Sequence, residues 1–313
     1  MKTAIVIPFY NGDDCIRSCL KSIANSSEPG LAVSLINNSD KPTDIHRIAE
    51  EFPNTTVMDT KPHIGYGHAN NVGAAAAISG GAEVIISINQ DTILDSHCVT
   101  ALLRPFHLDS QIGIVTPILY TYDFGSIEDC FLQWYITQCP GVLYDALKGE
   151  LKDHYRIKIA SGACFAIRSE IIKKYGLFDE LYFMYDEDDD LCRRIGYTDY
   201  RIVIALGARM AHKHSNSEVN PKKRLQIECW QRSSQVVFEL KDLNYGLFYN
   251  FAKIIAHSVF DCSRNILRLN LKACVMFFWS DIKSLAKIAG ILRSRKREIE
   301  IKNERLHAAA VID

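Results

Sequence analysis

The sequence has no surplus of charge of either sign, and this absence excludes one broad class of proteins. Its 36 Lys and Arg residues are balanced by 37 Asp and Glu residues, so the formal net charge is −1. A protein that binds nucleic acid through its surface normally carries a clear basic excess. We therefore expect no nucleic-acid partner. The 48% of hydrophobic residues in 313 is typical of a globular protein that buries a full core.

Paired cysteine motifs are also missing. None of the ten cysteines belongs to a C-x-x-C pair, so the sequence shows neither a zinc ribbon nor a thioredoxin-like motif. Most of the ten lie in apolar patterns, where a free cysteine behaves as a small hydrophobic residue. We interpret them as reduced core residues and expect a cytoplasmic protein.

Long hydrophobic runs are absent as well. The longest uninterrupted one near the C-terminus, residues 273–279, is far too short to span a bilayer. The apolar run at the N-terminus is interrupted by Pro8 and followed by Asp13 and Asp14. This pattern favours a first strand over a signal peptide. Internal repeats and low-complexity segments are not visible either.

The first half of the chain contains short β-branched runs that alternate with helical patterns. Strands are expected at 4–7, 32–36, 56–58, 84–88, 112–115, 159–167 and 200–205. Helices are expected at 13–25, after Thr43, at 67–80 and at 188–195. This alternation predicts an α/β fold with a mostly parallel sheet flanked by helices, and ligands at the carboxyl ends of its strands.

Two regions depart from the alternation. Residues 120–156 are rich in aromatic side chains and irregular, which indicates a variable excursion over a site. From 222 to about 306 the pattern is helical throughout. We expect a catalytic domain at 1–220 and a helical region at 221–313.

Polar residues follow several of the expected strands. Pro8, Tyr10 and Asn11 end the first, and an aromatic ring there can stack on a flat base. Asn37 and Asn38 end the second, where they could bond a base or a ribose, or simply form an Asx turn.

A carboxylate follows the strand at 84–88. Asp91, within Asn89-Gln90-Asp91, could hold Mg²⁺ or Mn²⁺ together with substrate phosphates, or could cap a helix near Ser96.

Five consecutive acids occupy 186–190 and are followed by Arg193 and Arg194. A solvated helix N-terminus tolerates such acids because they favour the macrodipole. The aromatic residues that precede them point instead to a carboxylate of raised proton affinity that acts as a general base.

The motifs together resemble the inverting family 2 glycosyltransferases with the GT-A fold, and most closely their bacterial rhamnosyltransferase-like members. The resemblance covers about residues 1–240 and rests on short segments in the same order: 5–11, 37–39, 65–73, 89–91, 161–165, 187–194 and 214–215. Two departures stand out. Asn37 replaces the usual Asp of the base-binding motif, and Asn89-Gln90-Asp91 replaces the common D-x-D metal motif.

The resemblance implies a role for each matching residue. The catalytic group is Asp188 as the base, with Glu187 and Asp190 beside it. Asp91 holds Mg²⁺ or Mn²⁺, and His214 is the second ligand, with His212 as its competitor. The donor-binding residues are Pro8, Tyr10, Asn11, Asn37, Asn38, Tyr66, Asn70, Asn71, Gln90, Asp91 and Arg194.

The implied reaction is sugar transfer, with inversion, from a nucleoside diphosphate sugar to a hydroxyl of a growing cell-surface glycan. The form of the metal motif favours dTDP-rhamnose, and a UDP-sugar (galactofuranose, glucose or N-acetylglucosamine) is the alternative. A sugar nucleotidyltransferase would need a Gly-rich basic loop after the first strand, which this chain lacks. A non-catalytic glycan-binding protein would have lost the carboxylates at 91 and 188.

The C-terminal region is basic. Residues 264–305 contain eleven Lys and Arg against four Asp and Glu, interleaved with apolar residues that include Phe277, Phe278 and Trp279. Such helices can lie on an anionic membrane surface, near a lipid-linked acceptor at the inner face of the cell membrane. The alternative is a helix hairpin that packs on the domain or on a second copy in a homodimer.

Overall fold

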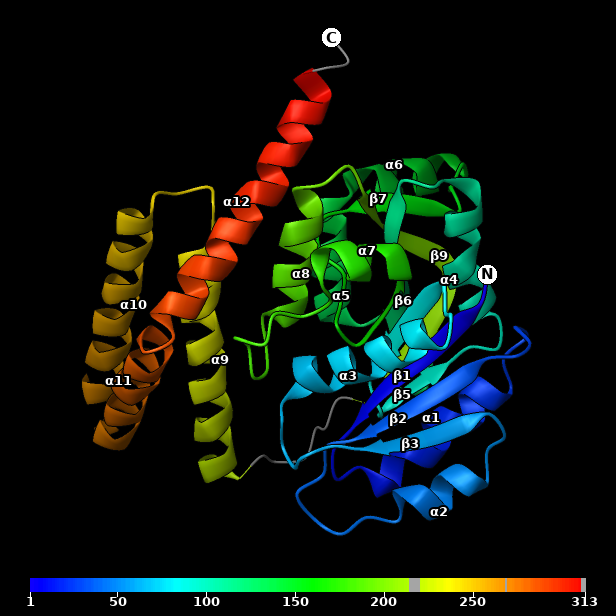
Figure 1. Ribbon diagram of the computed structural model, residues 1–313, viewed down its shortest axis with the longest axis horizontal. Helices are drawn as coiled ribbons and strands as arrows, with labels where there is room; N and C mark the ends of the chain where they lie inside the picture. Colours follow the sequence, from blue (N-terminus) through cyan, green and yellow to red (C-terminus); the bar gives the residue numbers. More distant parts are fainter. Residues whose placement is uncertain (214–219, 268, 311–313) are drawn as a thin grey trace. The chain divides into compact units, whose positions relative to one another are not determined.

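The computed structural model describes residues 1–213, 220–267 and 269–310. The chain divides into two compact units (Figure 1). The first comprises Met1–Phe178 and Leu191–Ser215, and the second comprises Asp179–Asp190 and Asn216–Asp313.

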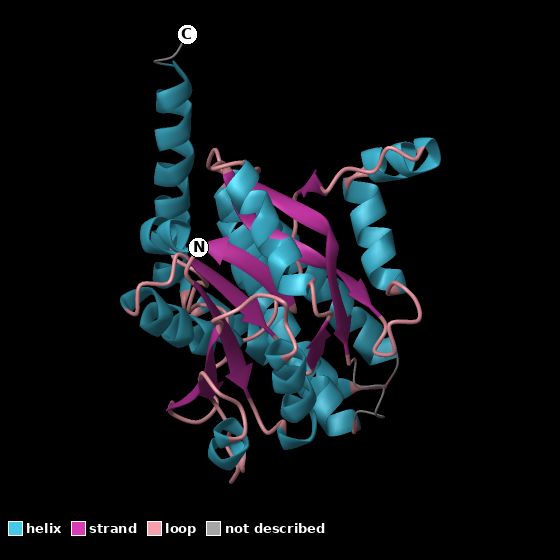
Figure 2. Cartoon of the chain, turned by 90° about the vertical axis from the view of Figure 1, so that its right-hand side faces the viewer, coloured by secondary structure: helices cyan, strands magenta, loops and turns pink. Residues whose placement is uncertain are grey.

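The described residues of the first unit are built on a nine-stranded sheet (Figure 2). The strand order is β3-β2-β1-β4-β8-β6-β9-β5, and β7 pairs with β9. The strands are β1 Thr3–Phe9, β2 Ala32–Asn37, β3 Thr55–Asp59, β4 Val84–Ile88, β5 Thr92–Leu94, β6 Ile112–Tyr120, β7 His154–Ile157, β8 Cys164–Arg168 and β9 Arg201–His212.

The first four strands of this order are parallel, as the sequence predicts. The other half is more mixed than expected. Strand β8 runs antiparallel to both β4 and β6, and β5 and β7 run antiparallel to β9, which is itself parallel to β6. The carboxyl ends of β1, β2, β3 and β4 therefore meet at one edge of the sheet.

Helices cover the sheet, which explains why its central strands read as continuous apolar runs rather than alternating ones. All five residues of β4 are buried. Helix α3 lies so close to the sheet that a Cβ on its Gly73 would come within 2.4 Å of Val6 and 3.0 Å of Ile36. The helices of this unit are α1 Asp13–Ala24, α2 Ile45–Glu50, α3 Tyr66–Ser79, α4 Cys98–Leu108, α5 Asp129–Gln138, α6 Pro140–Lys148 and α7 Ser169–Tyr175.

The aromatic stretch 120–156 is more regular than expected, because it contains α5, α6 and β7. Helix α6 begins with Pro140 and ends at Lys148, and Gly149, whose φ is 72°, follows it. Proline in the first turn and a left-handed glycine after the last are ordinary helix boundaries. The many aromatic residues of the stretch 120–156 made it read as irregular, so these helix boundaries were not predicted.

Strand β9 is twice as long as predicted. The sequence prediction stopped at Ala205, but the strand continues to His212. The pairing with β6 shifts register between Thr116 and Ile118, opposite residues 204–209 of β9. Gly207 lies in this irregular part, and a glycine inside a strand commonly marks such a bulge.

Helix α8, Glu187–Gly196, begins in the second unit's segment and ends in the first unit. The other helices of the second unit are α9 Pro221–Lys241, α10 Leu247–Leu267, α11 Leu271–Leu285 and α12 Ile288–Ala310. They confirm the helical character expected after 222. Asn220 caps α9, since its side chain accepts a hydrogen bond from Lys222 N at 2.9 Å, and Pro221 occupies the first turn.

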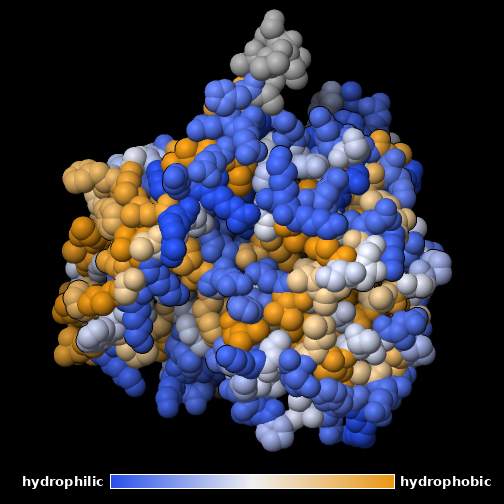
Figure 3. Space-filling model, in the orientation of Figure 1, coloured by the Kyte–Doolittle hydropathy of each residue, from blue (hydrophilic) through white to orange (hydrophobic). Residues whose placement is uncertain are grey.

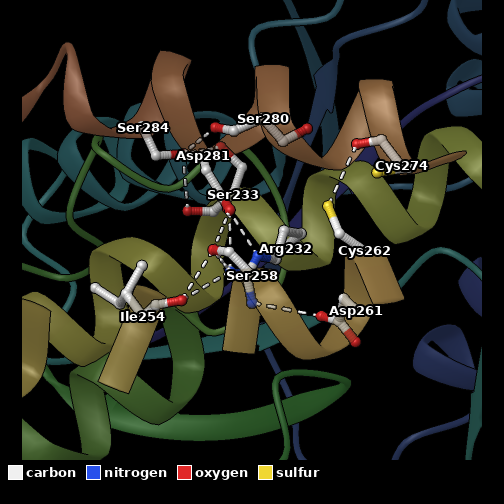
Figure 4. A network of polar contacts seen from close by, with 10 residues as sticks. All are labelled: Arg232, Ser233, Ile254, Ser258, Asp261, Cys262, Cys274, Ser280, Asp281 and Ser284. Atoms are coloured by element: carbon white, nitrogen blue, oxygen red, sulfur yellow. Dashed lines mark hydrogen bonds and ion pairs between the residues drawn. The ribbon is translucent and has the colours of Figure 1, made fainter. Parts of the chain in front are cut away.

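Apolar packing and buried polar contacts join these helices. Val236, Val237 and Leu240 of α9 form a core with Ile254, Ile291 and Tyr182. Tyr182 belongs to the segment Asp179–Asp190, which explains why this segment groups with the helices. Arg232 of α9 donates to Asp281 of α11 at 2.7 and 3.0 Å and to Ser258 of α10 at 2.5 Å (Figure 4).

Candidate active site

Polar side chains that follow β1 and β2 are hydrogen-bonded to one another. Asp40 accepts from Tyr10 Oη at 3.0 Å and from Asn11 Nδ2 at 2.7 Å, and Asn11 N donates to Ser39 Oγ at 3.1 Å. These bonds lower the pKa of Asp40, so the carboxylate stays ionised. Asn11 has a φ of 47°, a left-handed conformation that asparagine tolerates better than most residues.

Gln90 ties the end of β4 to the end of β1. Its Oε1 accepts from Tyr10 N at 2.8 Å and its Nε2 donates to Tyr10 O at 3.1 Å. A Cβ on Gly12 would come within 2.4 Å of this amide, so a larger residue there would push the Gln90 side chain away from Tyr10. Gln90 thus positions the Tyr10 backbone, while its predicted donor contact stays a prediction.

The ring of Tyr10 stacks on a second ring from the end of β3. The centroids of Tyr10 and His63 lie 4.8 Å apart, with 19° between the planes. The same loop is held by Asn38, which is buried and whose Oδ1 accepts from Ile64 N at 2.6 Å. A flat aromatic surface at a strand end can take a nucleobase.

Pro8 and Asn37 are the neighbours of this platform on β1 and β2. They pair with residues of the adjacent strand, Pro8 opposite Ile36 and Asn37 opposite both Phe9 and Asp59. The Asn37 side chain donates to Asp59 Oδ1 at 2.8 Å. This bond keeps the Asn37 amide at the sheet edge, and its contact with a base stays a prediction.

A carboxylate and an imidazole lie together at the start of β5. Asp91 Oδ1 is 3.3 Å from Nε2 of His212, because the antiparallel pairing of β5 and β9 sets His212 opposite Thr92. Asp91 O also accepts a hydrogen bond from Lys213 N at 2.9 Å. His214, the preferred second ligand in the sequence analysis, lies outside the described residues.

The amides expected to face the donor from α3 are engaged elsewhere. Asn70 is fully buried; its Oδ1 accepts from Ser87 Oγ at 2.7 Å and its Nδ2 donates to Tyr66 O at 3.2 Å. Asn71 makes two hydrogen bonds to the backbone of Phe178, at 2.9 and 3.0 Å. Both amides therefore hold the scaffold in this structure, and their contact with the donor stays a prediction.

Tyr66, at the start of the same helix, is a further scaffold contact. Its hydroxyl donates to Gly162 O at 2.7 Å, and its ring lies 5.8 Å from that of Phe178. Its predicted donor contact is not tested.

The acidic helix α8 follows two residues in the left-handed region. Tyr185 and Asp186 have φ values of 71° and 61°, an arrangement that costs free energy in ordinary residues. Glu187 is buried, and burial together with the charge of Asp188 raises its pKa to about 8. At neutral pH this carboxyl therefore holds a proton, as a general acid or base near its working pH would.

A buried lysine makes ion pairs with both ends of the segment Asp179–Asp190. Lys241 of α9 is fully buried, and its Nζ lies 2.7 Å from Asp190, 2.7 Å from Asp179 and 3.0 Å from Glu298 of α12. Asp190 also accepts from Tyr182 Oη at 3.0 Å. Asp190 is thus fixed by an ion pair, and a direct catalytic part for it stays a prediction.

Arg194 ends the acidic motif in a structural setting. Its guanidinium is buried and donates to the carbonyl oxygens of Tyr175, Gly176 and Leu177, at 2.9, 3.3 and 2.5 Å. Its predicted contact with the acids or with phosphates is not tested by these bonds.

A sequence model described as "Glycosyltransferase like family 2" matches residues 2–231, most of the chain. The chain belongs to glycosyltransferase family 2. The match begins just before β1 and ends within α9, so it includes every strand of the sheet.

Relatives and solved structures agree with this family. The chain is 24% identical over 240 residues to the N-acetylglucosaminyl-diphospho-decaprenol L-rhamnosyltransferase of Mycobacterium tuberculosis, covering 68% of this chain and 76% of the relative. Its fold resembles the mannosyltransferase PcManGT from Pyrobaculum calidifontis, solved with GDP-Man and Mn²⁺ (TM-score 0.55, 16% identity, 99% of this chain and 86% of that one). It also resembles residues 1–349 of S. aureus TarS in complex with UDP (TM-score 0.54, 13% identity, 100% and 92%). The glycosyltransferase therefore has the GT-A fold.

The metal-ligating side chains of this glycosyltransferase, Asp91 and His212, can hold a divalent cation only if a substrate supplies further ligands. Two ligands on neighbouring positions around Mg²⁺ lie about 3.0 Å apart, close to the observed Asp91–His212 separation. Among the described residues, however, no three His, Cys, Asp or Glu side chains are placed to hold a metal ion. Phosphate oxygens would have to supply the remaining ligands, which is the usual arrangement for Mg²⁺.

One residue among these strand ends, His63, could not be predicted from the sequence. Ser39 and Asp40 directly continue the polar stretch Asn37-Asn38, which the sequence already marked as able to bond a base or a ribose or to form a turn. His63 carries no motif of its own, and only the stacking on Tyr10 reveals it. His212, named from the sequence as the competitor of His214, is placed beside Asp91 by the pairing of β5 and β9.

Proposed function

We propose that this family 2 glycosyltransferase moves rhamnose from dTDP-rhamnose to a hydroxyl of a growing cell-surface glycan, such as an O-antigen or capsule. The observation that carries the proposal is the 240-residue similarity to a rhamnosyltransferase whose name specifies a lipid-linked acceptor. A hydroxyl of a lipid-linked glycan is accordingly the acceptor that we propose here.

Residues at the ends of β1, β2 and β3 receive the nucleotide in this proposal. The Tyr10–His63 pair offers the base a flat surface, and burial beside Asp40 raises the pKa of Tyr10, which keeps its hydroxyl protonated. Asn38 fixes the loop that carries His63. Asp40 has carboxylate oxygens that accept hydrogen bonds, as a ribose hydroxyl would require.

Asp188 serves as the general base. It removes the proton from the acceptor hydroxyl while that oxygen attacks the anomeric carbon opposite the diphosphate, so the configuration inverts in one displacement. The protonated state of Glu187 spares Asp188 a second adjacent negative charge. General-base catalysis of this kind contributes about 10²–10⁴-fold to a rate.

Asp91 and His212 would hold a divalent cation with the diphosphate, and His214 remains the other proposed ligand. A bound Mg²⁺ or Mn²⁺ would offset the charge that develops on the departing diphosphate. In our proposal the domain at 1–220 carries donor and acceptor binding, and the reaction takes place at the cytoplasmic face of the cell membrane.

A UDP-sugar donor is the second candidate, because TarS, which shares the fold, was crystallised with UDP. A donor screen distinguishes the two. Nucleotide release would be measured with dTDP-rhamnose, UDP-galactofuranose, UDP-glucose and UDP-N-acetylglucosamine, with and without a chelator, on the full chain. Asp188→Asn is the control, and it should lose at least about 100-fold in turnover while still binding nucleotide. Turnover of a UDP-sugar alone would contradict the rhamnose assignment, and a fully active Asp188→Asn would contradict the base.

A further inference from the structure

The outward side of α10 is apolar along the whole helix. Phe248, Ile255, Val259 and Ile266 are spaced seven, four and seven residues apart, so they form one stripe, and each is at least half exposed. A second stripe beside it contains Tyr249, Phe260 and Leu267. Arg264 is the single charged residue among the exposed positions of this helix, which is about 30 Å long.

Helix α11 continues this surface. Its exposed side presents Val275, Phe278, Trp279 and Ile282, with Phe278 and Trp279 exposed by 58% and 56%. Leu269, between the two helices, is 91% exposed. Figure 3 shows apolar side chains gathered over α10 and α11, at the left of the view. We call these exposed residues of α10, α11 and Leu269 the apolar face.

The charges of these helices are sorted by sign. Asp281 is buried and bonded to Arg232, and the partly exposed Asp261 lies 3.6 Å from Arg232 (Figure 4). Asp261 also lies 3.7 Å from Arg264. The exposed charged side chains of α10 and α11 are Arg264, Lys272 and Lys283, which are all basic. The exposed charges that border the apolar face are therefore basic, while its acids are buried or partly buried and paired with arginines.

We propose that the apolar face binds the interface of an anionic lipid bilayer. Apolar and aromatic side chains flanked by basic ones match the boundary between acyl chains and negative headgroups. A second copy of this chain would bring the same basic border against itself, and like charges repel. Among the described residues no helix is long and apolar enough to cross a membrane, so the face would lie in the interface.

The apolar face differs from the membrane-binding surface that the sequence predicted within residues 264–305. Phe277 is 8% exposed and belongs to the interior, whereas Phe278 and Trp279 remain outside. Arg295 of the basic α12 donates to the carbonyl oxygens of Leu240 and Tyr245 at 3.0 and 2.9 Å, so it is engaged within the unit. Helix α10, outside most of the basic stretch, supplies much of the face.

Vesicle sedimentation tests this inference, and because it needs no sugar donor, its outcome is independent of the proposed reaction. The full chain would be mixed with vesicles of phosphatidylcholine alone or with about one third phosphatidylglycerol. We expect binding to the anionic vesicles that is weakened about tenfold or more by Ile255→Glu. Leu108→Glu on α4 is the matched control, because Leu108 and Ile255 are 61% and 62% exposed, and it should leave binding within about twofold of wild type.

A second variant separates charge from apolar contact. Lys272→Gln combined with Lys283→Gln retains the apolar side chains and should lower binding to anionic vesicles only, as should about 1 M salt. Absence of binding to anionic vesicles, or an Ile255→Glu chain that binds like wild type, would overturn the proposal. The proposal would also be overturned if the wild type formed a dimer by light scattering and did not bind vesicles, and if Ile255→Glu dissociated that dimer.

Discussion

Glu187 retains a proton at neutral pH because the fold buries it beside other acids. Its pKa is raised to about 8, first by burial and then by Asp188, whereas the same group in an unfolded chain titrates near 4.5. Between these two values the folded protein binds one more proton than the unfolded protein. Its stability must therefore fall as the pH rises through this window and level off above pH 8.

Glu187→Gln should remove this pH dependence. The variant mimics the protonated carboxyl, so its free energy of unfolding should exceed that of wild type by a few kcal/mol, at about pH 8, and approach it near pH 5. Urea unfolding at both pH values measures the difference. Glu300→Gln on the exposed side of α12 is the control and should show no such trend. A difference that does not change with pH would show that Glu187 ionises freely in the folded protein.

At the scale of elements, two lysines of the helical unit make ion pairs of equal length in different surroundings. Lys241 is fully buried with Asp190 at 2.7 Å, and Lys253 lies 2.7 Å from Glu239 with a side chain that is 34% exposed. Removing one partner from a buried pair leaves an uncompensated charge, whereas an exposed pair contributes little because water replaces it.

Lys241→Met should therefore lower the free energy of unfolding by about 3–5 kcal/mol, because it leaves Asp179, Asp190 and Glu298 without their shared cation. Lys253→Met should cost less, about 1 kcal/mol, because the Lys253 end of its pair is open to water. Urea titration of both variants at neutral pH provides the comparison. Equal losses would mean that burial does not decide the strength of the Lys241 contacts.

At the scale of the whole molecule, the division into units differs from the expected boundary at 220. The segment Asp179–Asp190, which contains the proposed base, groups with the C-terminal helices. Tyr182 packs in their core, and Asp179 is bonded to Lys241 and to Ser294, at 2.7 and 2.5 Å. The segment thus depends on helical residues that lie 50 or more positions later in the sequence.

A chain that ends at residue 220 should accordingly be less stable than the full chain, since Tyr182 and Asp190 lose their contacts with the C-terminal helices. Its unfolding temperature should fall by several degrees, as about 2 kcal/mol or more of lost packing implies. Differential scanning calorimetry measures the shift. A chain that ends at residue 305 is the control, because it keeps the buried Ile291, Glu298 and Ile301. A 1–220 chain as stable as the full chain would support a domain boundary at 220.

The sequence by itself determined the local parts of this protein. Runs such as Val84–Ile88 predict buried strands, and polar residues after them predict a ligand-binding edge, because both signals lie within a few residues of each other. The order of the short motifs identified the family, which the match over residues 2–231 confirms.

Only the tertiary structure decided which distant residues meet. The antiparallel pairing of β5 and β9 brings His212 next to Asp91, although His212 lies 121 positions later in the chain. Stacking brings His63 next to Tyr10. The same holds for amphipathic helices, since α10 and α11 read as ordinary apolar patterns until packing shows which side is covered. The periodicity of one segment predicts that a helix has an apolar side. Whether that side is buried, and which strands pair, depends on residues that are far away in the sequence.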